Sequence, residues 1–216
     1  MILAIETSSN MCSVAICLKD KVLFEANHSA PMQHATLIGQ MVEKGLKEIQ
    51  GEITGVAVGI GPGSFTGLRI GMSYAQGLCF GRNIPIAGIS NHQVLAMQAD
   101  NQTIRLFTII DARRQEVYLA EHKLDSLFSI QSHKIVAMDE LTEIIPAGVS
   151  LVAHQDVKLS ENILEKLQRS KIHVKRDVGY FARDIAHLAQ KKFDHGLQDE
   201  IDNLEPMYIR PFAGAQ

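Results

Sequence analysis

The order of secondary-structure elements occurs twice along this chain, and this repeat limits its fold more narrowly than any other feature. Each half has the pattern of three strands, a helix, a strand and a helix. In the first half the predicted elements lie at 2–6, 12–18, 21–26, 35–49, 53–60 and 66–80. In the second half they lie at 105–111, 116–124, 127–137, 139–145, 149–154 and 160–167, followed by a strand at 171–174 and a helix at 178–193. We therefore predict an α/β chain of two mixed-sheet subdomains, 1–100 and 101–216.

The repeat lies in the order of elements, since the two halves share no residue-level identity that we can detect. Duplicated mixed sheets of this kind are known in actin-like ATPases and ribonuclease-H-like domains. A shared topology carries no function by itself, so the prediction at this point concerns the fold alone.

The bulk properties exclude several classes of protein. A net charge of −3 argues against a chain that holds nucleic acid by itself, because phosphate contacts need a basic face. The start, MILAIETSS, lacks a basic segment and carries Glu6, so we expect no signal peptide. No apolar run approaches the roughly 20 residues that cross a bilayer. The three cysteines form no C-x-x-C pair, which predicts buried, reduced thiols and a cytoplasmic protein.

The segment GVAVGIGPGSFTGLRIG runs from an apolar strand through glycines into a helix, as phosphate-binding loops do. It nevertheless matches neither common nucleotide motif. It lacks the lysine of a Walker A loop, and Thr66 stands where G-x-G-x-x-G needs its third glycine. Glu6, Thr7 and Ser8 in the first turn complete a vestigial phosphate loop with Gly61, Gly63 and Ser64, although a polar tight turn is the favoured interpretation.

Gly67, Gly71 and Ala75 recur every fourth residue and give the helix at 66–80 a bare face. Either this helix is central in the core, or another protein covers its second face. The amphipathic helix at 35–49 would complete half of a four-helix bundle, with the other half supplied by a second chain. The predicted interface residues are Ile38, Met41, Val42, Gly45, Gly67, Leu68, Gly71, Met72, Tyr74, Ala75 and Leu78.

Other polar residues carry weaker expectations. The nine histidines include no H-x-x-x-H pair, so we predict no metal site, and His34 is expected to cap or pack a helix. Asp111 and Arg113 mark a hairpin tip held by an ion pair or an Asx-type bond. The basic run at 165–176 is expected to be a solvated face.

Five segments, in this order, resemble the TsaB family, also called YeaZ, over nearly the whole chain. They are ILAIETSSNMCSVAI, GIGPGSFTGLRIG, AQGL, IDARRQEVY and EPMYIR. The resemblance implies an actin-like fold and a non-catalytic partner of the paralogue TsaD, bound through a helix bundle. TsaD transfers a threonylcarbamoyl group to the adenosine beside the anticodon of tRNA, and the ATPase TsaE joins the assembly. Family members also pair with themselves through the same helices.

The resemblance also implies one departure from TsaD and one from TsaB. Where TsaD has a metal-binding H-x-x-x-H, this chain has His92 and Ala96, so one ligand is lost. Glu6 stands where many TsaB chains have Asp, which leaves weak ATP or ADP binding near the first hairpin or at a complex interface open. Contact with tRNA is expected only through the complex, and no membrane contact is expected.

Two other functions remain as alternatives. An actin-like ATPase or kinase would require nucleotide affinity and a carboxylate-bound magnesium ion. A metallo-glycopeptidase would require a pair of metal ligands, which the histidine spacing does not provide.

Overall fold

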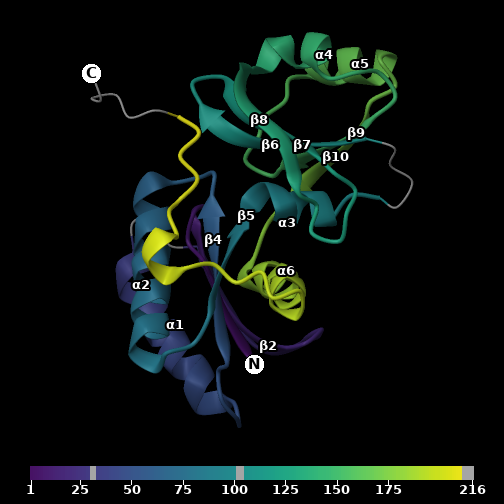
Figure 1. Cartoon of the computed structure of the whole chain (residues 1–216). Coiled ribbons are helices and arrows are strands. Elements are labelled where there is room, and N and C mark those ends of the chain that lie inside the picture. Colours follow the sequence, from purple (N-terminus) through teal and green to yellow (C-terminus); the bar gives the residue numbers. More distant parts are fainter. Residues whose placement is uncertain (30–32, 101–104, 211–216) are drawn as a thin grey trace. The chain divides into compact units, whose positions relative to one another are not determined.

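The computed structural model describes residues 1–29, 33–100 and 105–210 and divides the chain into two compact units (Figure 1). Unit 1 comprises residues 1–91 and 180–207, and unit 2 comprises residues 92–179 and 208–216. The elements in the first stretch of unit 1 are β1 Ile2–Glu6, β2 Met11–Leu18, β3 Lys21–Ser29, α1 His34–Glu48, β4 Gly55–Gly61, α2 Phe65–Arg82 and β5 Ile86–Ser90.

The sheet of unit 1 has five strands in the order β3-β2-β1-β4-β5. Strand β1 is central, since it pairs antiparallel with β2 and parallel with β4, and its five residues are all buried. The predicted order of three strands, a helix and a fourth strand in one mixed sheet is therefore confirmed. The sequence did not reveal β5 and the following helix α3, Asn91–Met97, because IAGIS is a short apolar run without strand alternation.

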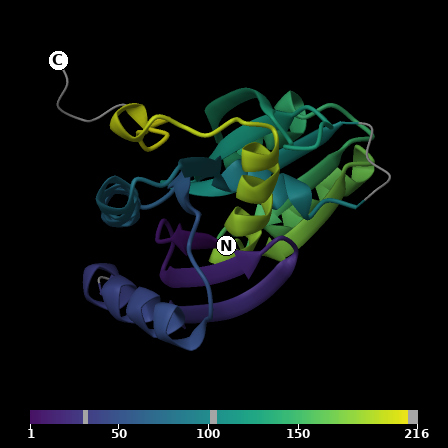
Figure 2. The ribbon, with the colours of Figure 1, turned by 60° about the horizontal axis from the view of Figure 1, so that its bottom comes forward.

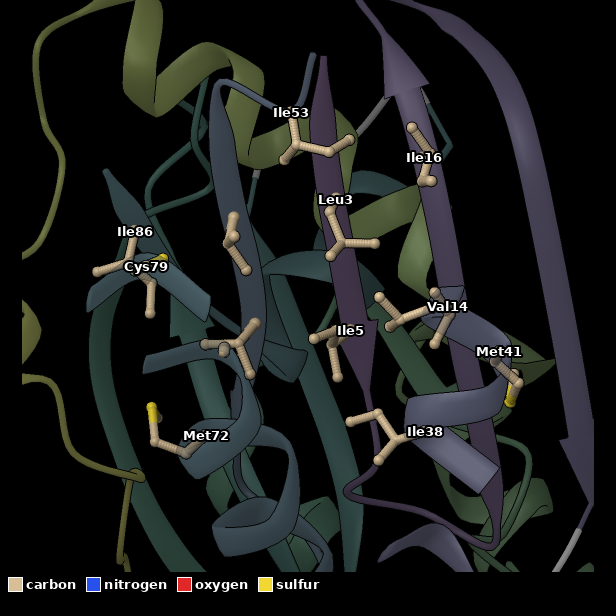
Figure 3. Close-up of a cluster of buried hydrophobic side chains, with 14 of the residues drawn as sticks. Leu3, Ile5, Val14, Ile16, Ile38, Met41, Ile53, Met72, Cys79 and Ile86 are labelled. Atoms are coloured by element: carbon tan, nitrogen blue, oxygen red, sulfur yellow. The ribbon is translucent and has the colours of Figure 1, made fainter. Parts of the chain in front are cut away.

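Both faces of this sheet are covered by helices of the same unit. Helices α1 and α2 lie on one face and α6, Ala182–Asp194, on the other (Figures 1 and 2). The core between the sheet and α1 and α2 includes Leu3, Ile5, Val14, Ile38 and Met72 (Figure 3). All three cysteines are buried free thiols, as predicted.

The division of the chain differs from the expected subdomains 1–100 and 101–216. The boundary lies after Asn91, and α6 returns to unit 1 although it belongs to the second half of the sequence. The reason is that the buried side of α6, with Ala182, Ile185 and Ala186, packs on β1 and β2. A helical stripe predicts a buried face without saying which sheet it covers.

A segment after α6 covers the free edge of β5. Asp199 N donates to Ile86 O at 2.9 Å, and Gly88 N donates to Asp199 Oδ2 at 2.8 Å. The short helix η2, Ile201–Asn203, then lies beside α2, where Gln76 Nε2 donates to Ile201 O at 2.8 Å. This cover removes an exposed sheet edge and ties α2 to the end of the chain.

Unit 2 repeats the strand order of unit 1. Its five strands run β10-β9-β6-β7-β8, so in both sheets the first strand is central, with the second and third on one side and the fourth and fifth on the other. The elements are β6 Leu106–Arg113, β7 Glu116–His122, β8 Ile130–Ala137, η1 Met138–Glu140, α4 Leu141–Ile144, β9 Ser150–His154, α5 Glu161–Arg169 and β10 His173–Val178. The predicted duplication is confirmed. None of the helices in the described ranges is both long and apolar enough to cross a lipid bilayer.

Candidate functional site

The glycine-rich loop connects the end of β4 to the first turn of α2, as the sequence predicted. Ser64 is the N-cap of α2, and its hydroxyl accepts a hydrogen bond from Gly67 N at 3.3 Å. Gly61 adopts a φ of +95°, which favours glycine. The segment therefore has the strand, tight bend and helix start from which anion sites are built.

The first turn of the chain fills this loop. Ser64 N donates to Ser8 O at 2.6 Å, and Thr7 Oγ1 donates to Gly67 O at 2.7 Å. A Cβ placed on Gly63 would lie 2.5 Å from Ser8 O, and one placed on Gly67 would lie 1.9 Å from Thr7 O. The glycines thus let the backbone of Thr7 and Ser8 approach the loop closely. The carbonyl of Ser8 accepts the hydrogen bond of Ser64 N, an N–H at the start of α2 that would otherwise be available to an anion.

Glu6 holds the same turn from inside the unit. Its carboxylate is fully buried, and Oε1 accepts hydrogen bonds from Ser8 N at 2.5 Å and from the Ser8 hydroxyl. Oε2 lies over Gly59, where an added Cβ would be only 1.8 Å away. No residue in the described part of the chain donates to Oε2.

The burial of Glu6 changes its ionisation. Burial raises the pKa of the Glu6 carboxyl from 4.5 to about 7, although the hydrogen bonds from Ser8 and Thr7 lower it. The effect of desolvation on the pKa is larger than that of the hydrogen bonds, because a buried carboxylate without a neighbouring cation is costly. Near neutral pH a large share of the molecules therefore carries a neutral Glu6 that braces a turn.

Two further residues close this polar network. Asn91 Nδ2 donates to Ser8 Oγ at 2.6 Å and to Pro62 O at 3.0 Å. Ser90 Oγ donates to Gly61 O at 2.9 Å. The structure thus brings the predicted residues Glu6, Thr7, Ser8, Gly61, Gly63 and Ser64 together. Sequence reasoning missed Ser90 and Asn91 because it did not recognise the strand that they follow.

The predicted interface residues lie elsewhere than expected. Ile38, Met41, Val42, Gly45, Gly67, Leu68, Gly71, Met72 and Ala75 are buried inside unit 1, and Tyr74 and Leu78 are half-buried. A Cβ on Gly71 would lie 2.3 Å from Thr7 Oγ1 and 3.5 Å from Ile5 Cγ2. The row of small residues therefore allows β1 and the first turn, rather than a second chain, to approach α2 closely. The small residues do allow a close approach to α2, as predicted. The segment that approaches is β1 with the first turn of the same unit.

The outer face of α2 carries a different set of residues. Its exposed positions are Thr66, Arg69, Ser73, Gly77, Phe80, Gly81 and Arg82. Phe80 is 82% exposed, and a Cβ on Gly77 or Gly81 would meet nothing within 4 Å. Tyr74 borders this face toward α1, where a Cβ on Gly39 would lie 4.0 Å from its ring. The outer face of α2 is thus an uncovered surface with small residues and a single large aromatic side chain.

His92 is fully buried in unit 2 and belongs to a chain of hydrogen bonds. His122 Nδ1 lies 2.8 Å from Phe128 O, and since a carbonyl only accepts, Nδ1 carries the proton. His122 Nε2 therefore accepts from the Thr108 hydroxyl at 2.9 Å, and Thr108 Oγ1 accepts from His92 Nδ1 at 2.7 Å. Burial lowers the pKa of both histidines below 6.5. Within the described ranges no three His, Cys, Asp or Glu side chains gather to hold a metal ion.

Comparison with known proteins shows the family to which the chain belongs. The family model described as "TsaD: tRNA N6-adenosine threonylcarbamoyltransferase" matches residues 28–204. The tRNA threonylcarbamoyladenosine biosynthesis protein TsaB of Escherichia coli is 30% identical, over 97% of this chain and 94% of that protein.

Solved structures extend the comparison to the fold. YeaZ from Pseudomonas aeruginosa matches with a TM-score of 0.75 and 25% identity, over 96% of this chain and 99% of the other. The ethanolamine utilization protein EutJ from Carboxydothermus hydrogenoformans matches with a TM-score of 0.54 and 7% identity, over 86% and 89%, which concerns the fold alone. The predicted actin-like fold is confirmed. The chain belongs to the TsaB family of tRNA threonylcarbamoyladenosine biosynthesis proteins.

Proposed function

We propose that this chain is a non-catalytic subunit of the complex that makes tRNA threonylcarbamoyladenosine, where it binds and stabilises a TsaD-like transferase. Family membership supports the pathway. The filled glycine loop supports a non-catalytic role. Ser8 O accepts the hydrogen bond from Ser64 N, and Thr7 O lies directly against Gly67, so the space of a phosphate is filled by the chain itself. A nucleotide phosphate at this helix start would have to displace a turn that Glu6 and Asn91 hold. The chain therefore needs no cofactor of its own, and any ATP or ADP binds weakly at the interface with its partner.

We place the partner on the outer faces of α1 and α2. Exposed aromatic side chains are the usual anchors of protein interfaces, and Phe80 is the large apolar side chain that α2 leaves in solvent. No acid occurs on α2, and Gly77 and Gly81 allow close approach of another helix. This face replaces the buried row as the surface of the helix bundle. It also forms the homodimer of the isolated chain.

The remaining partners follow from the same assembly. A TsaE-like ATPase joins the larger complex, tRNA is bound through the complex, and the site of action is the cytoplasm. An ATPase function of the isolated chain is less favoured, since its phosphate loop is closed by the chain's own backbone.

Light scattering tests the proposal on the chain alone and mixed with the TsaD-like transferase of the same cell, with and without ATP. We expect a new heteromeric species that forms at the expense of the homodimer. Loss of an anchor costs about 2 kcal/mol or more of binding free energy, so Phe80→Ser should weaken pairing at least about thirtyfold. Leu18→Ser is the matched control, because Leu18 is 50% exposed in the same unit but lies at the end of β2.

Three results would count against the proposal. The partner function fails if no complex forms under any condition. The location on α2 fails if Phe80→Ser and Leu18→Ser pair equally well. Calorimetric titration of ATP into the chain alone tests whether the filled loop excludes a nucleotide. Tight binding of ATP would refute the proposed non-catalytic role.

A further inference from the structure

The hairpin between β6 and β7 ends in a turn of unusual backbone conformation. Arg113, Arg114 and Gln115 have φ values of 65°, 55° and 63°, so three successive residues other than glycine are left-handed. Arg113 pairs with Glu116, which leaves Arg114 and Gln115 as the two loop residues. Two-residue turns with two positive φ values strongly favour Asn-Gly, because side chains other than those of Asn, Asp and Gly strain this conformation.

Several contacts from unit 2 hold the strained turn in place. Asp111 Oδ1 accepts a hydrogen bond from Arg113 N at 2.9 Å, and its Oδ2 lies 3.5 Å from the Arg113 guanidinium, which confirms the predicted Asx-type bond and ion pair. Arg210 donates to Ala112 O at 3.1 Å and pairs with Glu116. The tip is thus fixed by groups on both of its strands, and Arg113 of the hairpin and Arg210 from the C-terminal segment are each paired to a carboxylate.

Arg114 is the arginine of this tip whose side chain has no polar partner among the residues that the structure describes. It is exposed, and it makes no hydrogen bond or ion pair with any residue in the parts of the chain that the structure describes. Its backbone conformation nevertheless costs stability that Asn or Gly would avoid. Strain that neighbouring contacts maintain, at a residue with no structural role for its side chain, is typical of functional positions.

We propose that Arg114 binds the phosphodiester backbone of the tRNA substrate, with the ion-paired Arg113 beside it. This inference rests on the proposed function and assigns it a direct RNA contact. A guanidinium presents a planar set of donors that matches two phosphate oxygens, and a rigid tip loses little freedom on binding. The net charge of −3 means that the chain has no general attraction for RNA, so a local contact of this kind must act within the complex.

The test compares three variants in fluorescence anisotropy with a labelled, unmodified tRNA transcript, at several salt concentrations. Arg114→Asn removes the charge and relieves the left-handed strain, whereas Arg114→Lys keeps the charge. The matched control is Lys171→Asn, since Lys171 is also exposed, cationic and left-handed, with a φ of 55°, and lies in the same unit. Each variant is measured alone at low salt and mixed with the TsaD-like transferase, and its thermal midpoint is recorded.

We expect Arg114→Asn to weaken tRNA binding about fivefold to tenfold and to reduce the slope of log affinity against log salt by about 0.7 to 1, as loss of one phosphate contact predicts. Its thermal midpoint should stay the same or rise. Lys171→Asn should leave tRNA binding unchanged, and Arg114→Lys should retain most of the affinity. A fall in thermal midpoint for Arg114→Asn would reveal a structural role and overturn the inference.

Three other outcomes also overturn the inference. One is equal tRNA binding by Arg114→Asn and Lys171→Asn, and another is no tRNA binding by the wild-type chain in either sample. The third is loss of pairing with the transferase in Arg114→Asn at unchanged tRNA affinity, which would assign the tip to a protein carboxylate instead. Light scattering on the same samples reports pairing separately, so a failure of the proposed partner function is distinguishable from a failure of the RNA contact.

Discussion

Replacing Gly67 by alanine tests whether the row of small residues on α2 serves the internal packing of unit 1. The added Cβ would lie 1.9 Å from Thr7 O and 3.0 Å from Thr7 C, and both atoms are backbone next to the central strand. Such overpacking costs up to about 3 kcal/mol when the neighbour cannot move aside. Alanine recovers about 1 kcal/mol through its higher helix propensity. The expected net loss is therefore about 2 kcal/mol in the free energy of unfolding.

Gly77→Ala on the same helix is the control for this prediction. A Cβ at Gly77 meets nothing within 4 Å, so only helix propensity changes and the variant should gain about 1 kcal/mol. The chain has no tryptophan, so urea unfolding is followed by far-ultraviolet circular dichroism, at concentrations where light scattering gives a monomer. The two variants should differ by about 3 kcal/mol. Equal stabilities would show that the row faces away from the core, as an interface helix requires, and would refute the packing argument.

Two further predictions concern buried ionisable groups. Because the folded pKa of Glu6 is raised to about 7, the wild type should lose stability as pH rises from 4.5 to above 7, by about 3 kcal/mol relative to Glu6→Gln. Urea unfolding of both proteins at pH 5 and pH 8 measures this, and a constant difference between them would contradict it. Thr108→Val removes the hydroxyl that joins His92 and His122 and should cost unit 2 about 2–4 kcal/mol. Since burial lowers both histidine pKa values, the pair should destabilise the fold as pH drops below 6.5. This is measured in Glu6→Gln, which lacks the opposite contribution of the Glu6 carboxyl, and a flat profile of that variant below pH 6.5 would argue against the buried neutral pair.

The sequence determined the repeat and most of the elements, because hydrophobic periodicity is a local property of the chain. The apolar run at 2–6 suited a buried strand, and the stripe from Ile38 to Leu46 had the spacing of one face of a helix. The bend from β4 into α2 was also readable, since glycine and Ser64 are the residues that such a bend and its cap require. The strand β5 was missed although its run IAGIS is as short and apolar as the run at 2–6, because periodicity alone does not separate such a run from a segment of buried helix.

Only the tertiary structure decided what each of these features contacts. The sequence shows that α6 has a buried face, but its packing on β1 and β2 depends on how the chain returns to unit 1. Gly67 and Gly71 predict close approach to α2, and the same pattern fits a partner helix or an internal turn equally well. The position of Thr7 and Ser8, far away in the sequence, makes the turn the neighbour. Local periodicity specifies which residues are buried, whereas the identity of the buried contact comes from long-range pairing.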